Sequence, residues 1–164
     1  MDHIIVIIAT GIYSGMLPIV PGLWGSALAL MFWNFFKNLA LPMYIGITAV
    51  IFFIGLLAAE HAESIFAQQD ASPIVIDEFF GIFITLTAVS NYRFGGLFGF
   101  LIFIILDGLK PFPASWIDTN LHGGLGIMMD DLVAGIYALL FLHIILCFLT
   151  KKMQIFSNSR QAEN

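Results

Sequence analysis

Apolar residues fill most of the chain in long runs that no charge interrupts. Residues 4–36, 38–59 and 132–150 contain no Asp, Glu, Lys or Arg. A helix that spans a bilayer needs about 20 consecutive apolar residues, and a water-soluble domain has little use for several such runs. The pattern therefore predicts helices that cross or enter a membrane.

Prolines and polar turns divide these runs into separate helices. Pro18 and Pro21 interrupt the first run, because proline lacks the backbone N–H that a helix interior needs. Pro111 and Pro113 end a later segment, and the last helix is expected to stop before Lys151. The six predicted helices cover roughly residues 4–17, 25–36, 43–66, 74–90, 95–107 and 126–150.

These elements predict an all-α integral membrane protein, with about six transmembrane or membrane-embedded helices in one bundle. Composition agrees, since 60% of residues are hydrophobic, 10% are charged and the mean hydropathy is +0.97. We expect one membrane-embedded domain over residues 1–152 and a disordered tail over 153–164. The amino terminus lacks a basic region and a cleavage signal, so the first helix should be retained. The single cysteine, Cys147, excludes an internal disulfide.

Acidic residues gather on one face of this predicted bundle. If the helices alternate in direction, the connections after the first, third and fifth helices share a face. Carboxylates beside membrane helices are costly, and they tend to be paired, bound to metal or functional. Nine of the eleven acids lie in or beside the connections after the third and fifth helices: Glu60, Glu63, Asp70, Asp77, Glu78, Asp107, Asp118, Asp130 and Asp131.

Concentrated negative charge of this kind needs a cation. Because oxygen atoms are the available ligands, the fitting ion is hard and divalent, most simply Mg²⁺ with Mn²⁺ as a substitute. Acids in the first turn of a helix also stabilise its dipole, so capping is the competing interpretation for the two adjacent acid pairs. The expected metal ligands, which are also the expected catalytic residues, are Asp77, Glu78, Asp107, Asp130 and Asp131.

The segment between the fifth and sixth predicted helices adds features that suit a phosphate. Gly123 and Gly124 let the backbone approach a ligand closely and lead into a helix amino terminus. Lys110 and His122 supply positive charge nearby, although a snorkelling lysine and a plain loop histidine are the simpler interpretations. With the acids, these four residues predict a combined phosphate and metal site.

Several motifs carry a resemblance to a known family. The stretches DASPIVIDEFFG, DGLKPFPASWID and HGGLGIMMDDLVAGIYA resemble, in the same order, motifs of the phosphatidylglycerophosphatase A family, and PIVPGLWGSALA resembles its Pro-Gly-Thr-x-Gly-Thr/Ser segment. The resemblance covers roughly residues 11–140. Two positions depart from the family pattern: Ile104 stands where many members have Arg, and Leu23 stands where members usually have Thr.

The resemblance implies a multi-pass enzyme of the bacterial inner membrane that depends on Mg²⁺. Its substrate would be phosphatidylglycerol phosphate, held in the bilayer by its tails and converted to phosphatidylglycerol. We expect no nucleic-acid partner, and the oligomeric state stays open. By matching position, the implied functional residues are Asp70, Asp77, Glu78, Asp107, Lys110, His122, Asp130 and Asp131, with Glu60 and Asp118 as weaker candidates.

Four other classes compete with this interpretation. A purely structural membrane subunit would have no need for the Gly-Gly-x-Gly segment at residues 123–126. Another lipid-phosphate phosphatase would use the same residue types. A small ion or proton transporter would also bury acids, but it would distribute them across the depth of the bilayer. A CDP-alcohol phosphotransferase needs Asp-Gly-x-x-Ala-Arg, whereas Leu109, Lys110 and Pro111 follow Asp107 and Gly108 here. A phosphatase site requires Asp77, Asp107 and Asp131 to converge near one membrane surface.

Overall fold

All regular structure in the described part of the chain is helical, which confirms the predicted fold class. The computed structural model describes residues 2–89, 92 and 94–162, and side chains as far as residue 151. The elements are α1 (Asp2–Ala9), the 3₁₀ helix η1 (Ser14–Met16), α2 (Pro21–Phe36), α3 (Leu41–Phe66), α4 (Ile76–Thr85), α5 (Gly95–Leu109), α6 (Ala114–Asn120) and α7 (Gly123–Ala162).

Fewer helices can cross a membrane than the sequence predicted. Within the described residues, Leu41–Phe66 of α3 and Gly123–Lys151 of α7 are long and apolar enough. The bent pair α5 and α6, whose axes differ by 52°, would add a third crossing if it acts as one span. The sequence predicted about six transmembrane or membrane-embedded helices; two to three of the described helices are long enough to cross, because several apolar runs form shorter helices.

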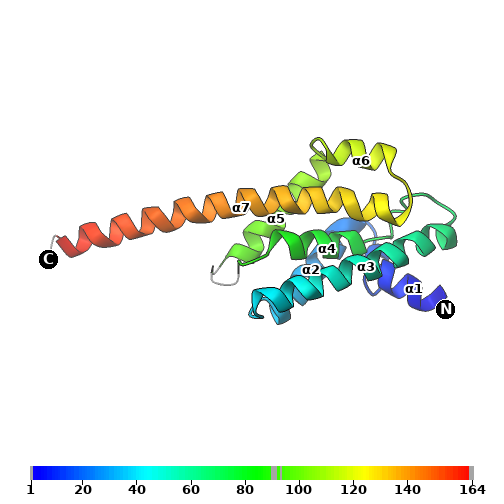
Figure 1. Cartoon of the computed structure of the whole chain (residues 1–164), viewed down its shortest axis with the longest axis horizontal. Coiled ribbons are helices and arrows are strands. Elements are labelled where there is room, and N and C mark those ends of the chain that lie inside the picture. The colour runs from blue at the N-terminus through cyan, green and yellow to red at the C-terminus, as the bar shows by residue number, and fades with distance from the viewer. Residues whose placement is uncertain (1, 90–91, 93, 163–164) are drawn as a thin grey trace.

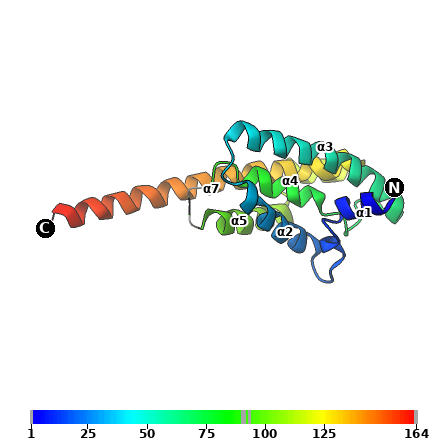
Figure 2. The same ribbon diagram turned by 90° about the horizontal axis from the view of Figure 1, so that it is seen from below.

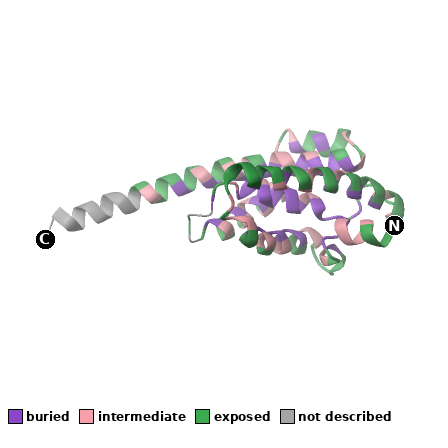
Figure 3. Ribbon diagram, turned by 60° about the horizontal axis from the view of Figure 1, so that its bottom comes forward, coloured by how far each residue is buried: buried purple, intermediate pink, exposed green. Residues whose placement is uncertain are grey.

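Helix α4 lies at the centre of the bundle (Figure 1). It packs against α2, α3, α5 and α7, and Figure 3 shows it as the most continuously buried element. Eight of its ten residues are buried, so its apolar surface is covered on nearly all sides. At about 1.5 Å per residue, α4 is roughly 15 Å long and is too short to span a bilayer core of about 30 Å.

Glycines allow α4 and α7 to approach closely. A Cβ atom added to Gly135 of α7 would lie 2.8 Å from the carbonyl oxygen of Gly81 on α4. A Cβ atom on Gly81 would overlap the ring of Phe103, a fully buried residue of α5. Small residues at such crossings let helix backbones come together. Gly81, Gly135 and Phe103 therefore form the layer where α4, α5 and α7 meet, as Figure 2 also shows for the helices.

Several helix boundaries differ from the prediction, and α4 ends at Thr85 instead of near residue 90. The first helix ends at Ala9 instead of near residue 17, because Gly11 adopts a φ of +52° and a 3₁₀ turn follows. Helix α2 begins at Pro21, since proline fits the first helical position. Pro113 caps the unpredicted helix α6.

A further difference concerns the last helix. Its backbone continues to Ala162, well past the predicted end at Lys151. Lysine is a good helix former, so a lysine pair can mark the edge of a membrane span without ending the helix. In Figure 1 this part of α7 extends away from the other helices.

Candidate active site

Three carboxylates from two helices meet at one end of the bundle. Asp77 and Glu78 stand in the first turn of α4, and Asp131 lies near the start of α7. One oxygen of each side chain lies within 4.8 Å of the other two. We call these three residues the acid triad. Glu78 is 9% exposed and Asp131 is 2% exposed, whereas Asp77 is partly buried.

Each member of the triad keeps an oxygen without a partner. Asp77 Oδ1, Glu78 Oε2 and Asp131 Oδ2 are buried and accept no hydrogen bond from the described residues. Buried polar atoms in proteins are normally satisfied, and a bound cation is one partner that would satisfy the unpaired oxygens of these three acids. A compact set of carboxylate oxygens suits a hard divalent ion, and the triad therefore fits the metal that the sequence predicted.

The helix layer described above explains why the triad forms. Glu78 precedes Gly81 by about one turn of α4, and Asp131 precedes Gly135 by one turn of α7. Asp107 follows Phe103 by one turn of α5, which runs in the opposite direction. The contact of Gly81 with Gly135 and Phe103 therefore brings all three acidic turns to the same end of the bundle. This confirms that the fourth, fifth and last predicted helices are mutual neighbours.

The electrostatics of α4, which is not among the helices long enough to span, favour binding of positive charge. Burial and then the charge of Glu78 hold the pKa of Asp77 well above its usual range. Burial raises the pKa of Glu78 to about 7, and the charge of Asp107 acts in the same direction. Asp107 is partly buried and influences the triad, although the group of converging oxygens does not include it.

Lys110 forms an ion-pair network beside the triad. Its Nζ lies 2.5 Å from Asp118 Oδ1 and 2.6 Å from Asp130 Oδ2. Asp130 in turn accepts a 3.0 Å hydrogen bond from the backbone N–H of Asp131. The Tyr137 hydroxyl donates to the carbonyl of Phe112, which fixes the connection carrying Lys110 against α7. Lys110 is thus linked to the triad through Asp130, the neighbour of Asp131 on α7, and its side chain is 31% exposed.

The two glycines that begin α7 have a different environment from the one the sequence predicted. The N–H of Gly124 donates to Glu60 Oε2 at 2.6 Å, so a carboxylate of α3 occupies this helix amino terminus. A Cβ atom on Gly124 would overlap the carbonyl of Leu56, and Gly123 has a φ of +74°. The close packing of α3 against α7 therefore explains why glycine occupies positions 123 and 124. Binding of a phosphate by Gly123 and Gly124 stays a prediction.

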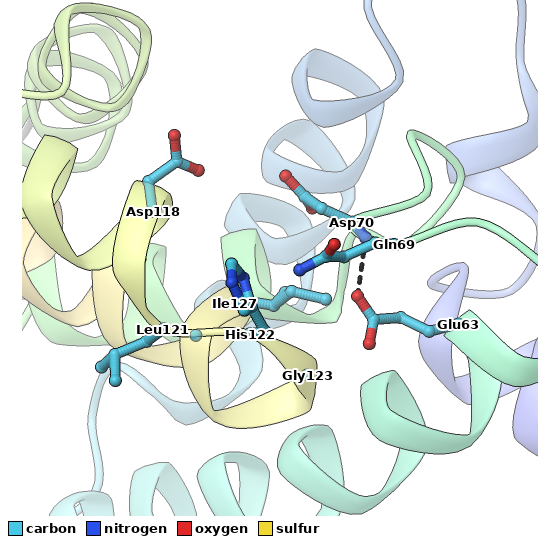
Figure 4. Close-up of a pocket in the computed structure, with 9 residues that line it drawn as sticks. Glu63, Gln69, Asp70, Asp118, Leu121, His122, Gly123 and Ile127 are labelled. Carbon is cyan, nitrogen blue, oxygen red and sulfur yellow. Dashed lines mark hydrogen bonds between the residues drawn. The ribbon is translucent and has the colours of Figure 1, made fainter.

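Other predicted site residues surround a separate pocket of about 270 Å³. Asp70, Asp118 and His122 line it together with Glu63, and Figure 4 shows these side chains around the opening. The backbone N–H of Asp70 donates to Glu63 Oε1 at 2.6 Å, as the dashed line in Figure 4 marks. Asp118 links this pocket to the triad through Lys110 and Asp130, whereas Asp70 and His122 are not part of the triad.

Gly22 is a contact of the triad that the sequence reasoning did not single out. A Cβ atom there would overlap Glu78 Oε1, so the amino terminus of α2 lies directly against this carboxylate. Pro21 and Gly22 occupy the first turn of α2, which has no side-chain cap. The positive end of a helix dipole stabilises a neighbouring carboxylate. The Pro-Gly pair in PIVPGLWGSALA was the available signal.

Over the described residues, fold and site together define a helical membrane protein with a buried carboxylate cluster at one end that could hold a metal ion. The chain belongs to the phosphatidylglycerophosphatase A family, whose sequence model matches residues 7–146. That name denotes a phosphoric monoester hydrolase, which places the chain in a family of enzymes.

Two individual relatives carry the name of this family, and a third carries a different one. The chain is 39% identical over 140 residues to phosphatidylglycerophosphatase A of Escherichia coli (strain K12), a match covering 85% of this chain and 81% of the relative. It is 33% identical over 136 residues to phosphatidylglycerophosphatase A of Haemophilus influenzae, covering 82% and 83%. It is also 33% identical over 152 residues to a Bacteroides thetaiotaomicron protein named provisionally as a phosphatidylinositol-3-phosphatase, covering 85% and 91%. No solved structure matches the chain.

Proposed function

We propose that this protein removes the terminal phosphate from phosphatidylglycerol phosphate, yielding phosphatidylglycerol in the inner membrane of a bacterium. The observation that carries the proposal is the acid triad, whose unpaired, buried oxygens converge beside a lysine. Family membership supports the choice of a phosphate ester as the substrate. The two long apolar helices support a lipid ester held in the bilayer and a multi-pass arrangement.

The triad is the proposed holder of Mg²⁺, with Mn²⁺ as a substitute. Asp77, Glu78 and Asp131 offer the ligand oxygens. Asp107 and Asp130 lie beside them and add negative charge that favours the bound cation. When bound, such an ion polarises a phosphoryl oxygen and makes a bound water a stronger nucleophile near neutral pH.

The remaining residues of the site position the substrate. Lys110 is close to the triad and partly exposed, so its ammonium group is the proposed partner of the phosphoryl oxygens. Asp118 and Asp130 hold that ammonium group in place. His122 lines the neighbouring pocket with Asp118, where the polar headgroup of the lipid is expected to enter.

The arrangement of the acids disfavours a transporter. A conducting path needs polar groups throughout the membrane depth, whereas the triad forms one group at one end of α4. One turn further along, α4 and α7 are in backbone contact at Gly81 and Gly135.

Phosphate release from a defined lipid tests the proposal. The purified full chain, in detergent with Mg²⁺, is expected to release inorganic phosphate from phosphatidylglycerol phosphate. EDTA should abolish that release, and added Mg²⁺ or Mn²⁺ should restore it. Full activity in EDTA would refute the metal assignment. Because one relative carries a different substrate name, phosphatidylinositol 3-phosphate is assayed in parallel, and a preference for it would reassign the substrate.

A further inference from the structure

An apolar groove on the outer surface of the bundle runs between α3, α4 and α7. Its volume is about 290 Å³, and its walls include Ala49, Phe52, Phe80, Ile84 and Leu132. Phe52 and Phe80 form one end of the groove, with ring centroids 5.0 Å apart. Since α3 and α7 are the two long apolar helices, a groove between them faces the hydrocarbon of the bilayer.

The polar atoms in this groove are already satisfied. Thr48 and Thr87 both line it, but each hydroxyl donates to a carbonyl one turn earlier in its own segment. Neither threonine hydroxyl is therefore free to donate a hydrogen bond to an occupant of the groove. The other residues that line the groove are apolar, so it suits an apolar occupant that packs against aromatic and aliphatic side chains.

The groove begins next to the acid triad. Phe80 follows Asp77 by three residues of α4, and Leu132 directly follows Asp131 on α7. From this end the groove extends along α3 from Phe53 back to Ile45, about 12 Å at 1.5 Å per residue. The near end of the groove therefore lies about one helical turn from the acid triad, and the far end lies along the apolar helix α3.

We propose that this groove binds an acyl chain of the lipid substrate and so positions its headgroup phosphate over the acid triad. The inference rests on the proposed function, because it names how that site holds its substrate. A phospholipid whose phosphate lies at the triad has its chains beside the groove, unlike a bulk lipid. Contacts remote from the reacting bond orient the substrate, so their loss lowers kcat/KM for substrates that use them.

The test fills the groove without touching the acids. Ala49 lines it and is exposed, so Ala49→Trp adds bulk there with little disturbance of the core. Phosphate release is measured with dioleoyl and dibutanoyl phosphatidylglycerol phosphate in the same detergent. We expect kcat/KM for the dioleoyl lipid to fall about tenfold or more, with the dibutanoyl lipid changed by less than about twofold. Ala49→Leu should give an intermediate result.

Val50 provides the matched control. It is the next residue on α3, is 55% exposed and does not line the groove. Val50→Trp should therefore leave kcat/KM unchanged for both lipids. If Ala49→Trp lowers kcat/KM equally for both lipids, or for neither, the proposal that the groove binds an acyl chain is wrong. The proposed function would remain intact.

A wild-type protein inactive on both lipids would instead refute the proposed function. Photolabelling then tests independently whether an acyl chain binds in the groove. The probe is a phosphatidylglycerol that carries a diazirine at the end of one acyl chain. Labels concentrated on residues 45–53 and 80–87 would support acyl-chain binding in the groove. Labels spread over all outward helix faces would contradict it.

Discussion

Replacing Asp131 by Asn should separate the chemical role of the acid triad from a structural one. The side chain is 2% exposed, and its Oδ2 has no hydrogen-bond partner among the described residues. The triad oxygens lie within 4.8 Å of one another, so two ionised members repel by about 3.5 kcal/mol or more at an effective dielectric constant of 20. Without metal, Asp131→Asn removes part of this repulsion.

The expected signature is opposite changes in stability and activity. Protonation already relieves some of the repulsion, so we expect a net gain of about 1–2 kcal/mol in EDTA. At about 2–4 °C per kcal/mol for a chain of this size, Tm should rise by a few degrees. Phosphate release should fall by about a hundredfold or more, since even residues that only support a metal ligand cost 10–100-fold.

Asp130→Asn provides the contrast at the adjacent position. Asp130 is paired with Lys110 at 2.6 Å, so its loss should cost about 1.5–3 kcal/mol and lower Tm in EDTA. Thermal unfolding of purified wild type and both variants, in EDTA and in Mg²⁺, compares their Tm values under both conditions. Mg²⁺ should raise the wild-type Tm through preferential binding to the folded state, and raise that of Asp131→Asn less. A destabilised Asp131→Asn together with a wild type insensitive to Mg²⁺ would refute the metal role of the triad.

Three further predictions test the surroundings of the site. Lys110→Met should lower kcat/KM by about 10²-fold, with Lys110→Arg retaining part of the activity, and equal phosphate release by wild type and Lys110→Met would contradict its role. Gly81→Ala should destabilise the protein by about 1–3 kcal/mol in thermal unfolding because its Cβ overlaps a buried ring, whereas Gly46→Ala, which meets nothing within 4 Å, should be neutral or stabilising. Gly22→Val should displace Glu78 and reduce the Tm increase caused by Mg²⁺, and an unchanged increase would exclude that contact.

Much of the helical framework could be predicted from the apolar runs. The predicted helix over 43–66 matches α3 closely, and the predicted start at residue 95 matches α5. Hydropathy alone could not show that α4 ends at Thr85, because the residues beyond it are also apolar. The number of membrane crossings was overestimated for the same reason, since an apolar run does not reveal whether its helix faces lipid or protein.

The site could be predicted in part, through residue type and motif order. The sequence predicted that Asp77, Asp107 and Asp131 converge; the group of converging oxygens contains Asp77 and Asp131, with Glu78 in place of Asp107. The contact of Glu60 with Gly124 could not be predicted, because it joins residues 64 positions apart through the packing of two helices. The sequence shows which acids are present, whereas the partner of each acid depends on helix rotation and on close approach at glycines.

The burial of α4 also determines the order in which the protein is assembled. A ribosome completes α4 before α7, yet α7 supplies Asp131 and one wall around α4. A segment this short and this enclosed has no independent place in the lipid, so the nascent chain must hold it against α2 and α3 until residues 123–151 emerge. The end of the bundle that carries the acid triad is therefore completed last during biosynthesis, because a chain that ends before α7 lacks Asp131 and the wall that α7 forms around α4.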